Sequence, residues 1–261
     1  MIKSASAFFV IAFFTFIQVN YPQKANKLIK QGDEFHNEFN HTESLGSYLK
    51  ADQLSPSNWE TLWRISREYL DIGHKMPENS DEEMDAKLDV FRQSFSYADS
   101  SVELAPDKSI PYVRRAIANG KIALFEGIFS VIGTVESVKE DCERAIQLDN
   151  GGDYYQSLAH FVLAKTHVKV CEKAYLFRLP LGLGWGDMEE AIREFTIAIK
   201  LKPNFRMYYL DLAKAYIEED EYELAKENLL MVEKAPFTLE DDDIYLNEAR
   251  ELMIVVNEEL E

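Results

Sequence analysis

The chain has 261 residues, of which 46% are hydrophobic, enough for one large domain or two smaller ones with packed cores. It carries 28 Lys and Arg residues against 46 Asp and Glu residues, a formal net charge of −18. Such an acidic surface repels nucleic-acid phosphates, so we expect no nucleic-acid partner. Two cysteines are too few for a disulfide scaffold or a cysteine-rich zinc module.

The first 21 residues contain an uncharged apolar run, residues 5–17, which begins two residues after Lys3. As a helix, this run is too short to cross a hydrocarbon core of about 30 Å. One cation followed by a short apolar segment is the layout of a secretory signal peptide. The alternative is an N-terminal membrane anchor formed by residues 5–17. Both interpretations predict an exported (periplasmic or secreted) or membrane-associated body over residues 22–261.

Beyond residue 21, apolar residues recur at helical spacing, which predicts an all-α fold. The spacing also fits the 34-residue tetratricopeptide (TPR) pattern, which places small residues where two helices cross. The last match is the clearest, with Tyr209, Leu212, Ala213 and Ala225 at the pattern positions and Pro236 near its end.

Similar partial matches recur along the chain, and together they predict an α-solenoid of about five TPR-like helical-hairpin repeats in a domain of residues 22–238. The expected repeats are 25–58, 59–108, 109–150, 153–203 and 206–236. Two of them carry insertions, one with the acidic stretch 78–85 and one of about twenty residues before the helix that includes Ala191. A capping helix is expected over 239–261, because a solenoid needs its last apolar face covered. Thr238 and Asp241 have the spacing of a capping box at its start.

Four irregular stretches carry a family resemblance: LWRISREY (62–69), ERAIQLDN (143–150), LPLGLGWGDMEEAIREF (179–195) and NFRMYYLDLAKAYIEEDEYELAKENL (204–229). With them the chain resembles, from about residue 24 to 257, the regulator of microtubule dynamics family and its bacterial TPR relatives. The resemblance implies a TPR solenoid with interaction roles. These are microtubule association in some animal members and membrane-contact tethering with phospholipid binding in others. It implies no catalytic motif.

The leading functional prediction is a non-catalytic scaffold that binds a peptide or protein partner in a concave groove. The repeat positions that face such a groove hold six residues: Trp63, Arg67, Gln156, His160, Leu210 and Lys214. An apolar anchor, a polar amide and two cations suit recognition of an acidic peptide or a C-terminal carboxylate. The alternative is a carrier or tether that holds a lipid or another apolar ligand in a cavity between the repeats, lined by residues 124–135 and 176–185.

The sequence shows no grouping of nucleophile, base and orienting residue, so we expect neither an enzyme nor a bound cofactor. His160, His167 and Cys171 lie along one predicted helix. The last two are four residues apart and could reach one zinc ion, but we interpret them as ordinary partly buried residues. His36 and His41 lack the H-E-x-x-H spacing and are expected to be solvent-exposed, so no metal site is predicted.

Gly182, Gly184 and Gly186 form G-x-G-x-G without a preceding strand, which indicates an inter-helix loop rather than a phosphate-binding loop. Cys142 and Cys171 are predicted not to form a disulfide. In the expected register they are offset by about 14 Å along the helix axes, and a disulfide tolerates a Cα separation of up to about 7 Å.

Overall fold

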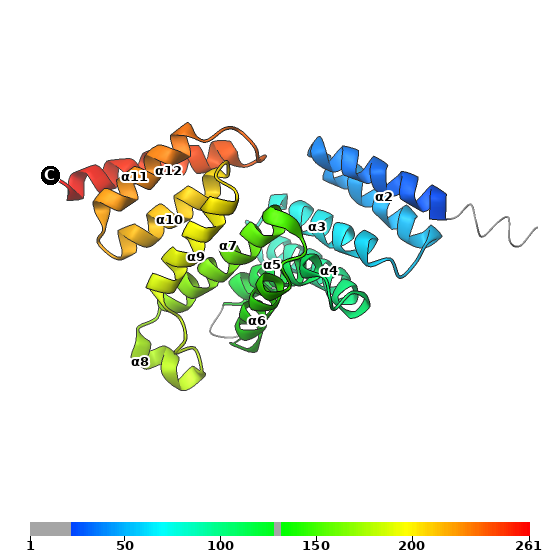
Figure 1. The fold of residues 1–261 in the computed structure, drawn as a ribbon, viewed down its shortest axis with the longest axis horizontal. Coiled ribbons are helices and arrows are strands. Elements are labelled where there is room, and N and C mark those ends of the chain that lie inside the picture. The colour runs from blue at the N-terminus through cyan, green and yellow to red at the C-terminus, as the bar shows by residue number, and fades with distance from the viewer. Residues whose placement is uncertain (1–21, 128–131) are drawn as a thin grey trace, which may run out of the picture. The chain divides into compact units, whose positions relative to one another are not determined.

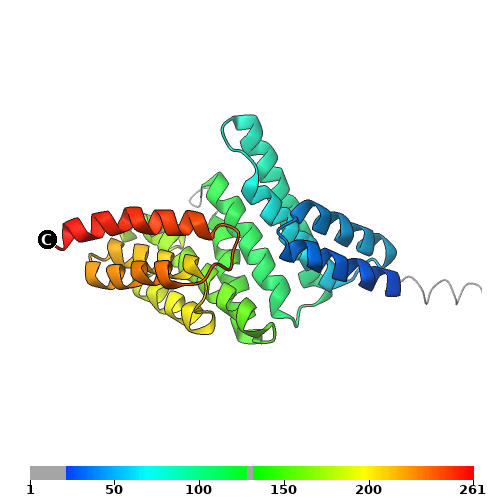
Figure 2. The ribbon, with the colours of Figure 1, turned by 90° about the horizontal axis from the view of Figure 1, so that it is seen from above.

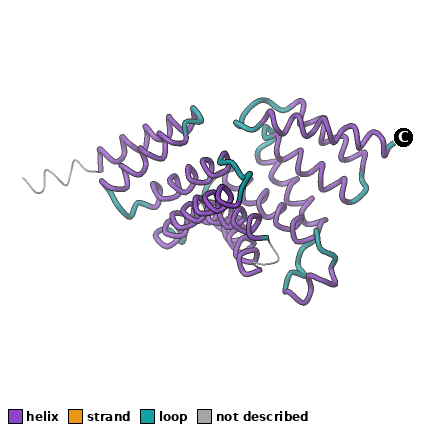
Figure 3. The backbone as a smooth tube through the Cα atoms, turned by 180° about the vertical axis from the view of Figure 1, so that it is seen from behind, coloured by secondary structure: helices purple, strands orange, loops and turns teal. Residues whose placement is uncertain are grey.

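The computed structural model describes residues 22–127 and 132–261, and all regular secondary structure in these ranges is helical (Figure 3). Residues 22–37 form the first helix. The elements that follow are α2 (His41–Leu54), α3 (Trp59–Lys75), α4 (Asp81–Leu104), α5 (Ser109–Glu126), α6 (Ile132–Leu148), α7 (Gly152–Cys171), α8 (Tyr175–Arg178), the 3₁₀ helix η1 (Leu179–Leu181), α9 (Met188–Leu201), α10 (Arg206–Glu218), α11 (Tyr222–Lys234) and α12 (Asp242–Glu259) (Figure 1). The predicted all-α class is confirmed.

The chain forms two compact units, Met1–Pro106 and Asp107–Glu261. In the described part of the first unit, helix 22–37, α2, α3 and α4 pack against one another in chain order. Its core contains small and large apolar side chains from three of these helices: Ala25, Ile29, Tyr48, Ala51 and Ile65.

Gly32 lets the first two helices approach closely. A Cβ atom at this position would lie 2.4 Å from Cε1 of Tyr48, well inside van der Waals contact. The Tyr48 ring cannot easily move away, because the side chain is fully buried and its hydroxyl donates to Oδ1 of Asp33 at 2.6 Å. The small residue that the TPR pattern requires here therefore has a direct steric cause.

The acidic stretch 78–85, expected as an insertion, lies mostly within a helix. Ser80 caps α4 by accepting a hydrogen bond from the Glu83 amide at 3.2 Å, and three acidic residues follow in the first turn. Carboxylates at this end are stabilised by the helix dipole. As a result α4 is 24 residues long, the longest helix among those described.

In the second unit, α5 packs on α6, α7 on α9, and α10 on α11. A cluster rich in aromatic residues joins α7, α9 and α10 through Phe161, Phe195 and Tyr208. A second cluster joins α10 and α11 to α12, with Leu229 and Val256 at its centre. In Figures 1 and 2, α12 (red) lies along α11 (orange), as expected of a capping helix.

The start of α12 differs from the predicted capping box. The side chain of Asp241 makes no capping hydrogen bond. Instead, Oδ2 of the fully buried Asp242 accepts from the amides of Thr238 and Leu239, at 2.6 and 2.8 Å. Arg206 on α10 supports the same loop by donating twice to the Ala235 carbonyl, at 3.0 and 2.8 Å. The loop is thus fixed by a buried carboxylate and a buried guanidinium.

Between α7 and α9 the chain forms a short segment that we call the apolar lobe, defined by the side chains of Tyr175, Leu176, Phe177, Leu179 and Leu181. All five are exposed, Leu176 and Phe177 to 80% and 73%. In Figure 1, α8 projects beyond the ends of α7 and α9. The lobe is anchored at its base by Leu183, which is fully buried with Ala123, Val135 and Val170.

The predicted signal peptide or anchor, residues 1–21, lies outside the described residues. Within residues 22–127 and 132–261, no helix combines the length and the hydrophobicity needed to span a membrane.

Candidate functional site

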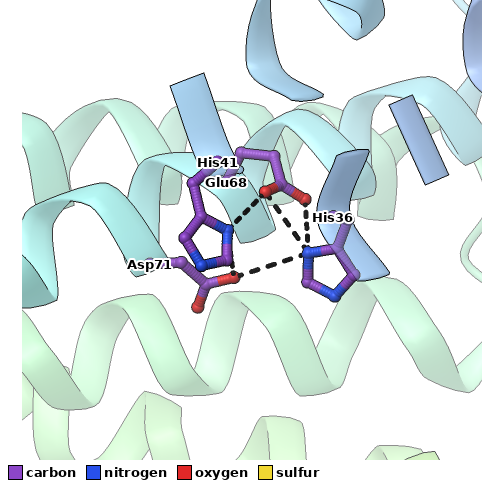
Figure 4. Close-up of side chains that lie close together, drawn as sticks. All are labelled: His36, His41, Glu68 and Asp71. Atoms are coloured by element: carbon purple, nitrogen blue, oxygen red, sulfur yellow. Dashed lines mark hydrogen bonds and ion pairs between the residues drawn. The ribbon is translucent and has the colours of Figure 1, made fainter. Parts of the chain in front are cut away.

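Four polar side chains from three helices gather in the first unit: His36, His41, Glu68 and Asp71 (Figure 4). His36 lies in the last turn of helix 22–37, and His41 is the first residue of α2. Glu68 and Asp71 are three residues apart on α3, so they share one face of that helix. Each side chain offers a nitrogen or oxygen atom, and these four atoms all lie within 4.8 Å of one another.

The turn between helix 22–37 and α2 sets the positions of the two histidines. The Asn40 amide donates to the Phe35 carbonyl and the Phe39 amide to the His36 carbonyl, each at 2.9 Å. This hydrogen-bond pair is a Schellman motif, in which the residue after the helix takes a left-handed conformation. Phe39 occupies that position with φ of 58°. The chain therefore reverses tightly, and both imidazoles meet α3.

Glu68 is at the centre of the cluster. Its side chain is completely buried, and Oε2 lies 2.9 Å from Nδ1 of His41 and 3.3 Å from Nδ1 of His36. The second oxygen, Oε1, lies 3.0 Å from Nδ1 of His36 and accepts from Nε of Arg67 at 2.8 Å. Asp71 completes the group, with Oδ2 3.9 Å from Nδ1 of His36 and 3.7 Å from Nδ1 of His41.

A second layer of polar contacts holds Arg67 in place. Its Nη2 donates to the Tyr48 hydroxyl at 3.0 Å, and that hydroxyl donates to Asp33. Asp33 also accepts from Nε of Arg64 at 2.9 Å. The buried carboxylate of Glu68 is thus the inner end of a network that reaches the surface through Asp33.

These contacts determine the ionisation of Glu68. Burial raises the pKa of this carboxyl, but hydrogen bonds from His36 and His41 and the positive charge of Arg67 outweigh burial and lower the pKa to about 2. Glu68 is therefore a fixed negative charge at neutral pH. An anionic oxygen beside two imidazole nitrogens and a second carboxylate is a ligand set that can hold a divalent metal ion.

The expectation that His36 and His41 are solvent-exposed is wrong. Their side chains are 25% and 10% exposed, because the turn directs both onto α3. No local motif signals this arrangement, since the ligating atoms come from three helices. The signal in the sequence is indirect: two histidines flank a repeat's inter-helix turn, and an i, i+3 carboxylate pair occupies the first helix of the next repeat.

Of the six residues predicted for a groove, two lie in the first unit beside this cluster. Trp63 is buried under two guanidinium groups, with Cζ of Arg64 4.3 Å and Cζ of Arg67 5.3 Å from its ring centroid. Arg67 is bound to Glu68 and Tyr48. Both side chains therefore make their contacts with other residues of the first unit.

The other four predicted groove residues lie in the second unit. Nε2 of Gln156 donates to Asp149 at 2.6 Å, and His160 pairs with Glu194 at 2.5 Å. Leu210 is a core residue, 1% exposed. Lys214 is half-exposed and pairs with Glu248 at 2.6 Å.

The other residues considered in the sequence analysis, His167, the two cysteines and the glycines near residue 184, also lie in the second unit. His167 accepts from the Asp187 amide at 3.2 Å and contacts the Trp185 ring edge to face, at 5.1 Å between centroids. Burial raises the pKa of both thiols, of Cys142 and of Cys171, and the two cysteines are unpaired. Gly182 has φ of 78° at the end of η1, a conformation that suits an inter-helix loop.

Helical hairpins stacked through small residues define the class of TPR-like α-solenoids, and the comparisons with solved structures agree. The fold is similar to the TPR protein TTC0263 of Thermus thermophilus, with a TM-score of 0.62 and 14% identity over 86% of this chain and 98% of that one. It is also similar to PilF of Pseudomonas aeruginosa, with a TM-score of 0.55 and 12% identity over 92% of each chain.

The chain belongs to the regulator of microtubule dynamics protein 1–3 family, whose profile matches residues 28–256. It is 26% identical to regulator of microtubule dynamics protein 3 of Rattus norvegicus over 88% of this chain and 48% of that protein. It is 27% identical to regulator of microtubule dynamics protein 1 of Mus musculus over 90% of this chain and 76% of that protein. The match thus spans about half the length of the rat protein.

This family assignment confirms the resemblance seen in the sequence and corrects the predicted localisation. The prediction of an exported, periplasmic or secreted protein is wrong, because the related proteins are eukaryotic regulators of microtubule dynamics, which are not exported by a bacterial-style signal. A positively charged residue before a short apolar run is too general a pattern to define export by itself.

Proposed function

We propose that the chain is a non-catalytic scaffold that binds a protein partner, and that the apolar lobe is the docking surface. The observation that carries this proposal is the exposure of five large apolar side chains within seven residues, Tyr175 to Leu181. A contiguous apolar patch on a folded surface is typical of an interaction site. Its aromatic and aliphatic side chains are of the kind that contribute most to binding energy.

The lobe is a preformed surface rather than an unstructured loop. Arg178 donates to the Gly186 and Leu183 carbonyls, which closes the segment on itself. Trp185 donates to Glu136 at 2.9 Å and so ties the end of the lobe to α6. Preorganisation reduces the entropy that a partner must overcome on binding.

The six predicted groove residues remain a prediction. Trp63, Arg67, Gln156, His160 and Leu210 are largely buried or hydrogen-bonded inside the chain, and only Lys214 is half-exposed. Groove binding would have to break these contacts, whereas the lobe offers its side chains directly. The lobe is for this reason the better-supported surface.

Microtubules are the first partner to test, because the relatives are named as regulators of microtubule dynamics. We expect the full chain to co-sediment with polymerised tubulin. Leu176→Glu with Phe177→Glu should weaken the association at least about tenfold, since it places charge in two apolar contacts worth 1 kcal/mol or more each.

The matched control is Leu224→Glu with Leu230→Glu, which introduces the same charges at two half-exposed leucines of α11. Circular dichroism should show unchanged helical content for both variants. Equal loss in the control, or full binding by the lobe variant, contradicts the proposal. If microtubules do not bind the full chain, the same pair of variants is compared for the proteins each captures from cells.

A second candidate is a lipid-binding tether. One contact between the two apolar segments predicted to line a cavity supports it, since Val135 of the first segment packs with Leu183 of the second. The exposed side chains of Leu176 and Phe177 have the character of residues that insert between acyl chains. Flotation with phosphatidylcholine vesicles tests this candidate: binding that Leu176→Glu with Phe177→Glu abolishes would favour lipid over protein.

A further inference from the structure

We propose that His36, His41, Glu68 and Asp71 form a zinc-binding site that joins the first helical hairpin to α3. This site is independent of the docking surface, because the apolar lobe belongs to the other compact unit.

The spacing of the ligand atoms fits a four-coordinate ion. Zinc bonds of 2.0–2.2 Å to nitrogen and oxygen, arranged as a tetrahedron, set neighbouring ligand atoms about 3.3 to 3.6 Å apart. The distances from Nδ1 of His41 and His36 to Oε2 of Glu68 are 2.9 and 3.3 Å. Those from the same nitrogens to Oδ2 of Asp71 are 3.7 and 3.9 Å. These four distances lie within about 0.4 Å of the tetrahedral range, and all four ligand atoms lie within 4.8 Å of one another.

The donor chemistry selects the kind of metal. Two imidazole nitrogens favour zinc and its neighbours among the transition metals over magnesium and calcium, which prefer oxygen ligands alone. Two carboxylates balance the double charge of the ion within a partly buried site. No exposed open position is needed, so the site is of the structural type, closed by four protein ligands.

The surroundings of Glu68 provide the support that metal ligands require. Arg67 donates to Oε1 at 2.8 Å, and Oε2 lies 2.9 Å from Nδ1 of His41 and 3.3 Å from Nδ1 of His36, whose Nδ1 is also 3.0 Å from Oε1. Arg67 is in turn fixed by Tyr48 and Asp33. Ligating carboxylates are usually hydrogen-bonded through their second oxygen in this way, and such contacts maintain ligand orientation.

The ion also has a route into the site. The side chains of Asp71 and His36 are 30% and 25% exposed, whereas Glu68 is fully buried. Zinc would therefore enter from the side of Asp71 and His36. Coordination through Nδ1 requires the imidazole proton to reside on Nε2 or to leave to solvent, so affinity should fall as the pH is lowered.

The test uses the full chain without a polyhistidine tag, stripped of metal with EDTA. Calorimetric titration with zinc sulfate should show one ion bound per chain. Thermal denaturation with zinc present should show a raised melting temperature. Cobalt(II) should give the intense visible absorption of a four-coordinate site. His36→Asn and Asp71→Asn, which change the two more exposed ligands, should each weaken zinc binding at least about tenfold.

Two controls separate this site from histidine binding in general. His160→Asn disrupts a histidine–carboxylate pair in the second unit, with Glu194, and His74→Asn changes an exposed histidine on α3. Both should bind zinc as the unmodified chain does. Absence of stoichiometric binding, wild-type affinity in the two ligand variants, or an equal loss in the controls would overturn the proposal.

Discussion

Glu68 shows how a single buried charge can determine its surroundings. An isolated carboxylate in a protein interior is strongly unfavourable, and removing one partner of a buried charge is usually more costly than losing a surface pair. Here two imidazoles and a guanidinium surround the carboxylate. Since these partners come from helix 22–37, α2 and α3, the charge links these three helices of the first unit to one another.

The low pKa of Glu68 predicts acid-sensitive stability. Because the folded pKa lies near 2 and the ordinary value is 4.5, the folded chain binds fewer protons than the unfolded chain between these two pH values. The stabilisation, roughly 3 kcal/mol, is present above pH 4.5 and is lost as the pH falls through 2. Urea denaturation at a series of pH values, with EDTA present, should show this loss.

Glu68→Gln should be less stable at pH 7 and should lack this part of the acid-side loss. The control is Glu103→Gln, which changes an exposed carboxylate of α4 and should leave the pH profile unchanged. Parallel profiles for the unmodified chain and Glu68→Gln would show that the buried charge has no role in acid denaturation. His36, His41, Arg67 and Asp71 are the charged or titratable neighbours that both profiles share.

At the scale of elements, the two glycines of the first hairpin differ in their surroundings. Gly32 lies where two helices approach closely, whereas Gly46 does not. Gly32→Ala gains about 1 kcal/mol of helix propensity but forces the fixed Tyr48 ring aside, at a cost of about 1–3 kcal/mol. We expect it to lower the free energy of unfolding. Gly46→Ala, in α2, meets no atom within 4 Å and should raise that free energy by about 0.5–1 kcal/mol. Urea denaturation measures both, and a change of the same sign would refute the steric argument.

The attachment of α12 depends on Arg206. Replacing this buried side chain in Arg206→Leu leaves the Ala235 carbonyl without its two donors and should cost about 2–3 kcal/mol. Relative to the unmodified chain, Arg206→Leu should speed amide hydrogen exchange in α12 more than in α7. Arg250→Leu removes only an exposed pair with Glu233 and should cost less than about 1 kcal/mol. If exchange in α12 is unaffected by Arg206→Leu, the apolar contacts of Leu229 and Val256 suffice to hold the helix.

At the scale of the whole molecule, the features that could be predicted are those that repeat. Helical periodicity predicts the all-α class, and small residues at the pattern positions, such as Ala213, indicate helix contacts. The irregular stretches, among them residues 179–195, indicated the family. Each of these signals is local in sequence, so one chain suffices to detect it.

The candidate site could not be predicted because it depends on how three helices meet. His36 and His41 are separated by a turn in which Phe39 takes a left-handed conformation. A phenylalanine does not indicate this conformation in a sequence, whereas a glycine would. Glu68 and Asp71 were visible only as ordinary charges on a repeat helix. The same reason applies to Leu210, which repeat numbering assigns to a groove, whereas its side chain is 1% exposed and packs in a core cluster. Whether the predicted groove binds a partner stays a prediction.

The position of the apolar lobe has a consequence for how this family can diversify. The helices on either side, α7 and α9, pack directly on each other through Phe161, Ala164 and Phe195, so their pairing does not rely on the segment that joins them. Lengthening such a connection costs little entropy. Residues 174–182 can therefore change in sequence or length between relatives while α7 and α9 stay packed. A new binding preference can then arise without substitutions in the repeat helices.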